Sequence, residues 1–130
     1  MGLSKNDVSG IVIGAAIEVH TALGPGLLER PYKECLWYKL QKSGLYIERE
    51  KPIPLIFEGA NVDCGYRVDL LVEGVLVIEV KSVASLADIH LAQTINYLKL
   101  GNYSVGLLIN FNVIRLKDGI KRLVNGPYPL

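Results

Sequence analysis

The chain has 130 residues, of which 50% are apolar and 21% are charged, and its formal net charge is +1. This length is sufficient for one domain with a core of its own, and the composition excludes an intrinsically disordered chain. The near-neutral charge excludes a protein that binds nucleic acid through overall basicity, so any nucleic-acid surface has to be a local patch.

The sequence gives no sign of export or of a membrane span. The N-terminus lacks the basic and apolar regions of a signal peptide, and the apolar run IVIGAAIEVHTALG is too short for a bilayer and contains Glu18 and His20. Cys35 and Cys64 form neither a disulfide framework nor a metal-binding spacing. We therefore expect a soluble, cytoplasmic protein that does not contact membranes. Its mean hydropathy of +0.29 favours a buried subunit interface, and hence a homodimer.

Two helices are predicted in the N-terminal third of the chain. Apolar residues recur at helical spacing from Val8 to Leu23, after candidate N-caps at Asn6 and Asp7. The glycine–proline–glycine that follows ends this helix, and a second helix is predicted over residues 27–43.

The rest of the chain changes to a strand-rich pattern. Residues 45–81 predict three or more strands, 86–100 a third helix, and 103–111 a buried strand. Residues 113–124 predict a closing hairpin on an Asp-Gly turn. No repeat or linker interrupts the resulting α-α-β-β-β-α-β-β order, which predicts a single α/β (α+β) domain over residues 1–130.

Two charged residues, Glu79 and Lys81, lie in the most apolar stretch of the chain, LLVEGVLVIEVKS. Side chains alternate along a strand, so these two share one sheet face. Asp69 lies on the preceding strand, and the length of the turn between the two strands decides which sheet face its side chain takes. A two-residue loop at Glu73–Gly74 sends Asp69 to the other face, whereas a three-residue loop that ends at Gly74 places it diagonal to Glu79. We expect the longer loop, because Gly74 then takes the left-handed position that favours glycine.

Two converging carboxylates repel each other, and their burial is costly unless a cation compensates the charge. Lys81 supplies one positive charge, and a hard divalent cation held by oxygen ligands would supply more. Such an ion can activate a bound water, while the neighbouring amine helps to deprotonate the water or stabilises charge on a phosphate. The pattern therefore indicates a phosphodiesterase centre. The alternative is an ion pair between Glu79 and Lys81 in a structural protein that binds no metal.

The predicted third helix carries a polar stripe. Gln93 and Tyr97 are four residues apart and share one face, with His90 one turn earlier. This stripe is either the solvent side of an amphipathic helix or a set of donors and acceptors for a phosphate or a metal-bound water. We expect His90 to be a surface residue.

The order of these residues resembles the PD-(D/E)XK nuclease superfamily, and within it the RecB-like branch. Asp69, the Glu79-x-Lys81 pair and the Gln93-x-x-x-Tyr97 helix match the superfamily motifs in sequence order. The sequence departs from the pattern at Val68, where the superfamily's name has proline.

The stretch IEVHTALGPGLLERPY is similar to the signature of the GxxExxY protein family, with Gly26, Glu29 and Tyr32 in the named positions. The two resemblances together run from about Ile11 to Phe111, which is most of the chain.

The resemblance implies a restriction-endonuclease-like core, with a mixed central sheet flanked by helices. It also implies an Mg²⁺-dependent (or Mn²⁺-dependent) nuclease that acts on DNA rather than RNA. Its implied metal ligands are Asp69, Glu79 and the Val80 carbonyl; its catalytic residues are Glu29, Asp69, Glu79 and Lys81, and its substrate contacts are Tyr32, Gln93 and Tyr97. The alternative is a module of the same fold that binds nucleic acid or takes part in an assembly without turnover.

Overall fold

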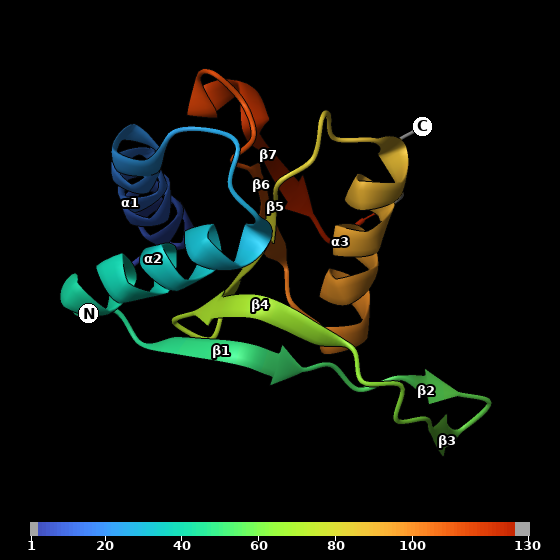
Figure 1. Cartoon of the computed structure of the whole chain (residues 1–130). Coiled ribbons are helices and arrows are strands. Elements are labelled where there is room, and N and C mark those ends of the chain that lie inside the picture. The colour runs from blue at the N-terminus through green and yellow to red at the C-terminus, as the bar shows by residue number, and fades with distance from the viewer. Residues whose placement is uncertain (1–2, 127–130) are drawn as a thin grey trace.

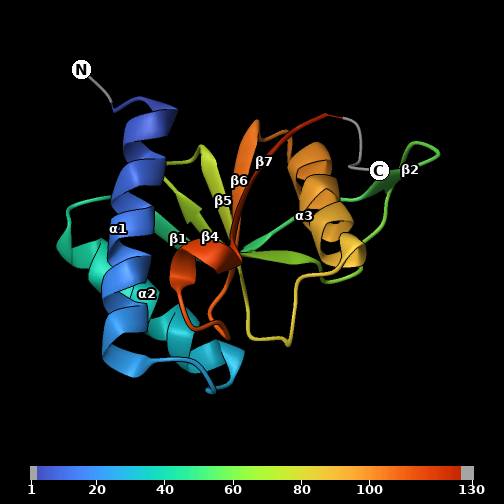
Figure 2. The same cartoon turned by 90° about the horizontal axis from the view of Figure 1, so that it is seen from above.

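The protein is a five-stranded sheet with helices on both faces, seen here in a computed structural model that describes residues 3–126. Helices α1 (Lys5–Leu23) and α2 (Glu29–Lys42) cover one face, and α3 (Asp88–Gly101) covers the other (Figures 1 and 2). Within the described residues, no helix is both long enough and apolar enough to span a bilayer.

The sheet is mixed, as predicted. Its strands lie in the order β1-β4-β5-β6-β7, and their bounds are β1 (Ile47–Pro52), β4 (Arg67–Val72), β5 (Leu76–Lys81), β6 (Val105–Asn110) and β7 (Ile120–Val124). Only the β5–β6 pair is parallel, because α3 forms the crossover between these two strands. The three strands that carry the candidate site, β1, β4 and β5, therefore lie side by side.

Two short strands form a separate hairpin that projects from the body. Strands β2 (Ile56–Phe57) and β3 (Ala60–Asn61) pair only with each other, and we call residues 54–66 the β2–β3 arm (Figure 1). The predicted minimum of three strands over residues 45–81 is met by five, two of which belong to this arm.

The core has two parts, one on each face of the sheet. Helices α1 and α2 pack on alternate residues of β5, including Ile78 and Val80, whereas α3 packs on the opposite face against Val77. Gly106 lets α3 approach β6 closely, because a Cβ at this position would lie 3.2 Å from the Leu98 side chain. The face that α3 covers is the one on which Glu79 and Lys81 were predicted to lie.

Two local predictions are wrong. Helix α1 is capped by Ser4, whose Oγ accepts from the Asp7 amide at 3.1 Å while Asp7 accepts from the Ser4 amide. Asn6 and Asp7 thus lie inside the helix, which begins before the apolar stripe because a capping box formed one turn earlier.

The predicted hairpin over residues 113–124 is also replaced. Residues Leu116–Gly119 form a 3-10 helix, and β7 pairs with β6 instead. The physical reason is an anchor to α1: His20 Nε2 lies 2.7 Å from the Val113 carbonyl oxygen, and Leu116 is buried in the core. These contacts remove the segment from strand pairing.

Candidate active site

Asp69 and Glu79 meet where the ladder between β4 and β5 opens. The paired residues end at Leu70 and Ile78, and the same register continued by one residue places Asp69 opposite Glu79. Here side chains replace main-chain partners: the Asp69 amide donates to Glu79 Oε2 at 2.8 Å, and the Val80 amide donates to Asp69 Oδ2 at 2.8 Å. Each carboxylate is thereby fixed by one oxygen and keeps the other for a further partner.

The turn that sets this register is a three-residue loop, but it is shifted by one residue from the prediction. The loop is Glu73–Gly74–Val75, with φ of 55° at Glu73 and 67° at Gly74. Glu73 tolerates the left-handed conformation because it is held at both ends: its amide donates to the Tyr46 carbonyl and its carboxylate accepts from the Tyr46 amide. Asp69 is therefore directly opposite Glu79 rather than diagonal to it, on the same sheet face as predicted.

Burial dominates the electrostatics of this pair. Glu79 is only 5% exposed, and burial, followed by the nearby Asp69 charge, raises its pKa to about 8. Burial also raises the pKa of Asp69, partly offset by the bond from the Val80 amide. Without a bound cation, the pair therefore holds a proton near neutral pH.

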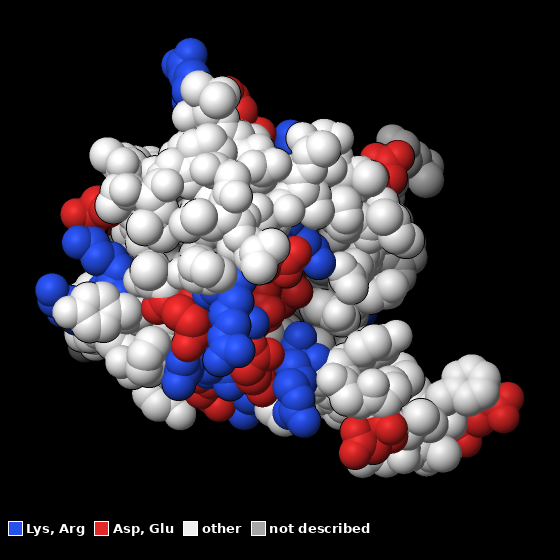
Figure 3. Space-filling view, viewed as in Figure 1, with Lys and Arg blue, Asp and Glu red and all other residues white. Residues whose placement is uncertain are grey.

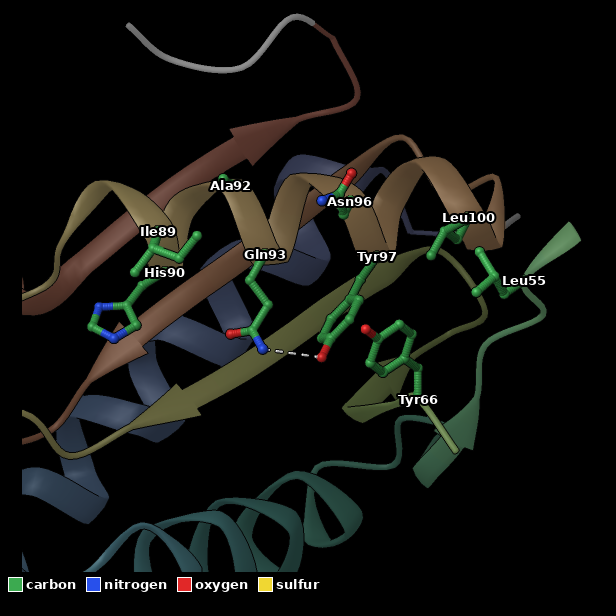
Figure 4. A pocket seen from close by; sticks show the side chains of 9 residues that line it. All are labelled: Leu55, Tyr66, Ile89, His90, Ala92, Gln93, Asn96, Tyr97 and Leu100. Atoms are coloured by element: carbon green, nitrogen blue, oxygen red, sulfur yellow. Dashed lines mark hydrogen bonds between the residues drawn. The ribbon is translucent and has the colours of Figure 1, made fainter. Parts of the chain in front are cut away.

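Lys81 joins the pair to the polar stripe of α3. Its Nζ donates to Gln93 Oε1 at 3.1 Å, and Gln93 Nε2 donates to the Tyr97 hydroxyl at 3.2 Å (Figure 4). Burial, and then the Glu79 carboxylate, raise the pKa of Tyr97, so its hydroxyl stays protonated as a neutral donor. His90 is half-buried at the start of α3, where its ring accepts from the Ala87 amide and caps the helix.

Two charged residues of the site were missed by sequence reasoning. Lys33 on α2 lies 3.6 Å from Asp69 Oδ1 and 2.5 Å from Glu50 on β1. Burial opposes the charge of Lys33, but its bond to Glu50 and the Asp69 charge outweigh this and raise its pKa. The β1–β4 register places Glu50 opposite Asp69, and its φ of 51° marks a left-handed residue inside a strand.

A sequence signal existed for only one of these residues. Lys33 follows Glu29 by one helical turn, so it shares the helix face that the resemblance assigns to the site. Glu50 had no signal, since its position depends on the register of β1.

The two predicted site residues of α2 have different environments. Glu29 opens α2 and is exposed, and it is not among the charges that shift the pKa of Asp69 or Glu79. Tyr32 is fully buried: its ring stacks on Phe111 at 4.7 Å, and its hydroxyl donates to the Gly24 carbonyl. Tyr32 therefore has no surface to present to a substrate, and it holds the loop between α1 and α2.

Positive and negative side chains are interleaved around the site. Over α2 and β1, blue and red side chains alternate in Figure 3. Arg49 pairs with Glu34 at 3.0 Å, and Lys51 pairs with Glu48 at 2.8 Å. This surface carries local cations but forms no continuous basic patch.

Few protein ligands for a metal are available at the site. Across residues 3–126, no three His, Cys, Asp or Glu side chains come together closely enough to hold an ion. The acidic pair of Asp69 and Glu79 is supplemented by main-chain oxygen: the amide and carbonyl of a strand residue point to the same side, so the Val80 carbonyl lies on the side where its amide meets Asp69.

A mixed sheet flanked by helices, with two carboxylates and a lysine on adjoining strands, is the arrangement of a nuclease-like fold. A sequence model of the PD-(D/E)XK nuclease superfamily matches residues 6–123, and the chain belongs to this superfamily. Members of the superfamily are typically nucleases, which generally use divalent metals such as Mg²⁺. No curated protein and no solved structure matches the chain.

Proposed function

We propose that the protein is an Mg²⁺- or Mn²⁺-dependent nuclease that hydrolyses phosphodiester bonds, with DNA as the substrate that the superfamily resemblance favours. Within the superfamily we assign it to the RecB-like branch and to the GxxExxY family. The observation that carries the proposal is the buried Asp69–Glu79 pair, whose carboxyl groups have raised pKa values and lie beside Lys81.

The donor set fits a hard divalent cation. Asp69 and Glu79 each keep one oxygen after bonding to a main-chain amide, and the Val80 carbonyl adds a third oxygen donor. Mg²⁺ commonly takes one or two carboxylates and retains several waters, so a small set of protein ligands is sufficient. When bound, the ion would act as a Lewis acid on the phosphate and lower the pKa of a coordinated water.

The remaining side chains orient the substrate and move charge or protons. Lys81, held by Gln93, would stabilise negative charge on the phosphate or assist deprotonation of the attacking water. Tyr97 offers a neutral donor to a phosphate oxygen. Glu29, at the exposed start of α2, would assist from the substrate side.

The direct test is cleavage of four substrates, namely single- and double-stranded DNA and RNA, by the wild-type protein with Mn²⁺. We expect cleavage of at least one DNA substrate, its loss with EDTA, and unchanged activity in Lys117→Ala, which alters an exposed lysine of the 3-10 helix. A well-folded wild type that binds the nucleic acids but cleaves none of them would contradict the proposal and favour a binding module.

Lys33 is expected to compete with the metal, since its ammonium group already faces Asp69 Oδ1. Lys33→Met should therefore bind Mn²⁺ up to about fivefold more tightly, the gain that removal of a partly exposed ion pair permits. The affinities are measured by isothermal titration calorimetry, with Lys39→Met as the matched control because Lys39 pairs with the distant Glu18. Equal affinities in the two variants would show that Lys33 does not oppose the ion.

A further inference from the structure

A groove of about 640 Å³ lies beside the candidate active site, between α3 and the base of the β2–β3 arm (Figure 4). Its walls are Leu55 and Tyr66 from the arm and residues of α3 that include Ile89 and Leu100. The nine lining residues include no Asp, Glu, Lys or Arg. A volume of this size is within the range of small-molecule sites, and neutral walls suit an uncharged ring rather than a phosphate.

The groove adjoins the carboxylate centre through Gln93. Gln93 and Tyr97 line it, and the same Gln93 holds the Lys81 ammonium group through its side-chain oxygen. A nucleotide whose phosphate lies at Lys81 thus has the groove within reach of its base.

Tyr66 gives the groove an exposed aromatic surface. It is 46% exposed, whereas Tyr97 beneath it is only 8% exposed and is packed in the core. The two ring centroids are 5.8 Å apart at an angle of 50°, so Tyr97 supports the Tyr66 ring from one side (Figure 4). A supported and accessible aromatic ring is the kind of platform on which an unpaired base stacks.

The arm itself is acidic and offers no cation to the phosphates of a second strand. Residues 54–66 contain Glu58 and Asp63 and no Lys or Arg, and the arm shows acidic but no basic side chains in Figure 3, whereas Lys51 and Arg67 flank its base. A second strand laid across it would place phosphates against these acids. Lys33 and Lys81 lie at the carboxylates, and Lys51 and Arg67 lie at the base of the arm, so a single backbone can be held there.

We infer that this groove binds an unpaired nucleobase, so that the protein selects single-stranded nucleic acid with the base stacked on Tyr66. The inference rests on the proposed function for the position of the phosphate, and it adds the substrate class. The base is bound through its ring, which DNA and RNA share.

The test is fluorescence anisotropy with Ca²⁺ present, using labelled single strands about 12 nucleotides long, within the site sizes of single-strand binding. The probes are oligo(dT), oligo(rU), an abasic deoxyribose-phosphate strand and a DNA duplex, and a gel run alongside checks that they stay intact. Wild type should bind oligo(dT) about 5- to 150-fold more tightly than the abasic strand. Tyr66→Ala should lose this preference, Tyr66→Trp should keep it, and Tyr38→Ala, at a tyrosine that is 60% exposed on α2, should behave as wild type.

Three outcomes would overturn the inference: equal wild-type affinity for oligo(dT) and the abasic strand, equal losses in Tyr66→Ala and Tyr38→Ala, or a dimer that Tyr66→Ala dissociates. The last would mean that a second copy of the chain occupies the groove. A wild type that cleaves nothing but keeps the Tyr66-dependent preference would refute the nuclease proposal and support the base site. A wild type that cleaves nucleic acid but shows no preference for oligo(dT) over the abasic strand would support the nuclease proposal and refute the base site. Tighter binding of oligo(dT) or of oligo(rU) would identify the sugar that the site prefers and, in either case, support the inference.

Discussion

Lys81→Ala is expected to lower the rate of cleavage by ~10²–10⁴-fold, the contribution typical of a positioned proton-transfer group. The substitution leaves Asp69 and Glu79 in place and removes only the amine that Gln93 orients. Binding of Mn²⁺ should therefore persist, and should be somewhat tighter because a nearby positive charge has gone. This separation of metal binding from cleavage distinguishes a catalytic lysine from one that only balances charge.

The measurement is single-turnover cleavage alongside Mn²⁺ titration, for wild type, Lys81→Ala and the surface control Lys117→Ala. Since Lys117 is exposed on the 3-10 helix, its loss tests whether removal of any one positive charge has the same effect. Unchanged cleavage in Lys81→Ala would place the chemistry elsewhere in the molecule.

Glu79→Gln is expected to abolish both cleavage and the stabilisation of the fold by Mn²⁺. It should also change how the free energy of unfolding depends on pH. The pKa of Glu79 in the folded protein, about 8, lies above its ordinary value of 4.5. Between these two values the folded protein keeps a proton that the unfolded chain has lost, so the free energy of unfolding of the metal-free wild type falls as pH rises. The fall begins near pH 4.5 and is complete above about pH 8.

A glutamine at position 79 does not titrate, and its oxygen can still accept from the Asp69 amide. Metal-free Glu79→Gln should therefore be more stable than wild type above about pH 8, by on the order of a few kcal/mol. Mn²⁺ should stabilise wild type but not the variant, because only wild type has both ligands. Urea unfolding from pH 5 to 9 with and without Mn²⁺ measures both effects, and Glu58→Gln, at an exposed glutamate of the arm, is the control. If the free energy of unfolding changed with pH in the same way for metal-free Glu79→Gln and wild type, the raised pKa of Glu79 would be contradicted.

Alternation along β5 was sufficient to place Glu79 and Lys81 on one face, because a buried strand enforces its register through its apolar residues. The register of the β4–β5 hairpin was off by one, since the turn is fixed by Tyr46, which lies 27 residues before Glu73. The turn propensities of Glu73 and Gly74 do not predict this contact with Tyr46.

The parts of the site that came from other elements were less predictable. Glu50 reaches Asp69 only through the β1–β4 pairing and a left-handed backbone conformation. Tyr32 looked like a substrate contact because it belongs to the GxxExxY signature, but Phe111, at the far end of the sequence match, covers its ring. Contacts between segments so far apart in the sequence follow from the packing of the complete sheet. The hydrophobic periodicity of a single segment does not predict them.

The central claim is that Asp69 and Glu79 hold a catalytic metal, and a crystal structure of the wild type grown with Mn²⁺ tests it most directly. We expect an anomalous-scattering peak between the two carboxylates, with the Val80 carbonyl next to the ion and Lys33 displaced from Asp69. A saturated crystal with no peak between Asp69 and Glu79, or with its Mn²⁺ bound only at another site, would contradict the claim.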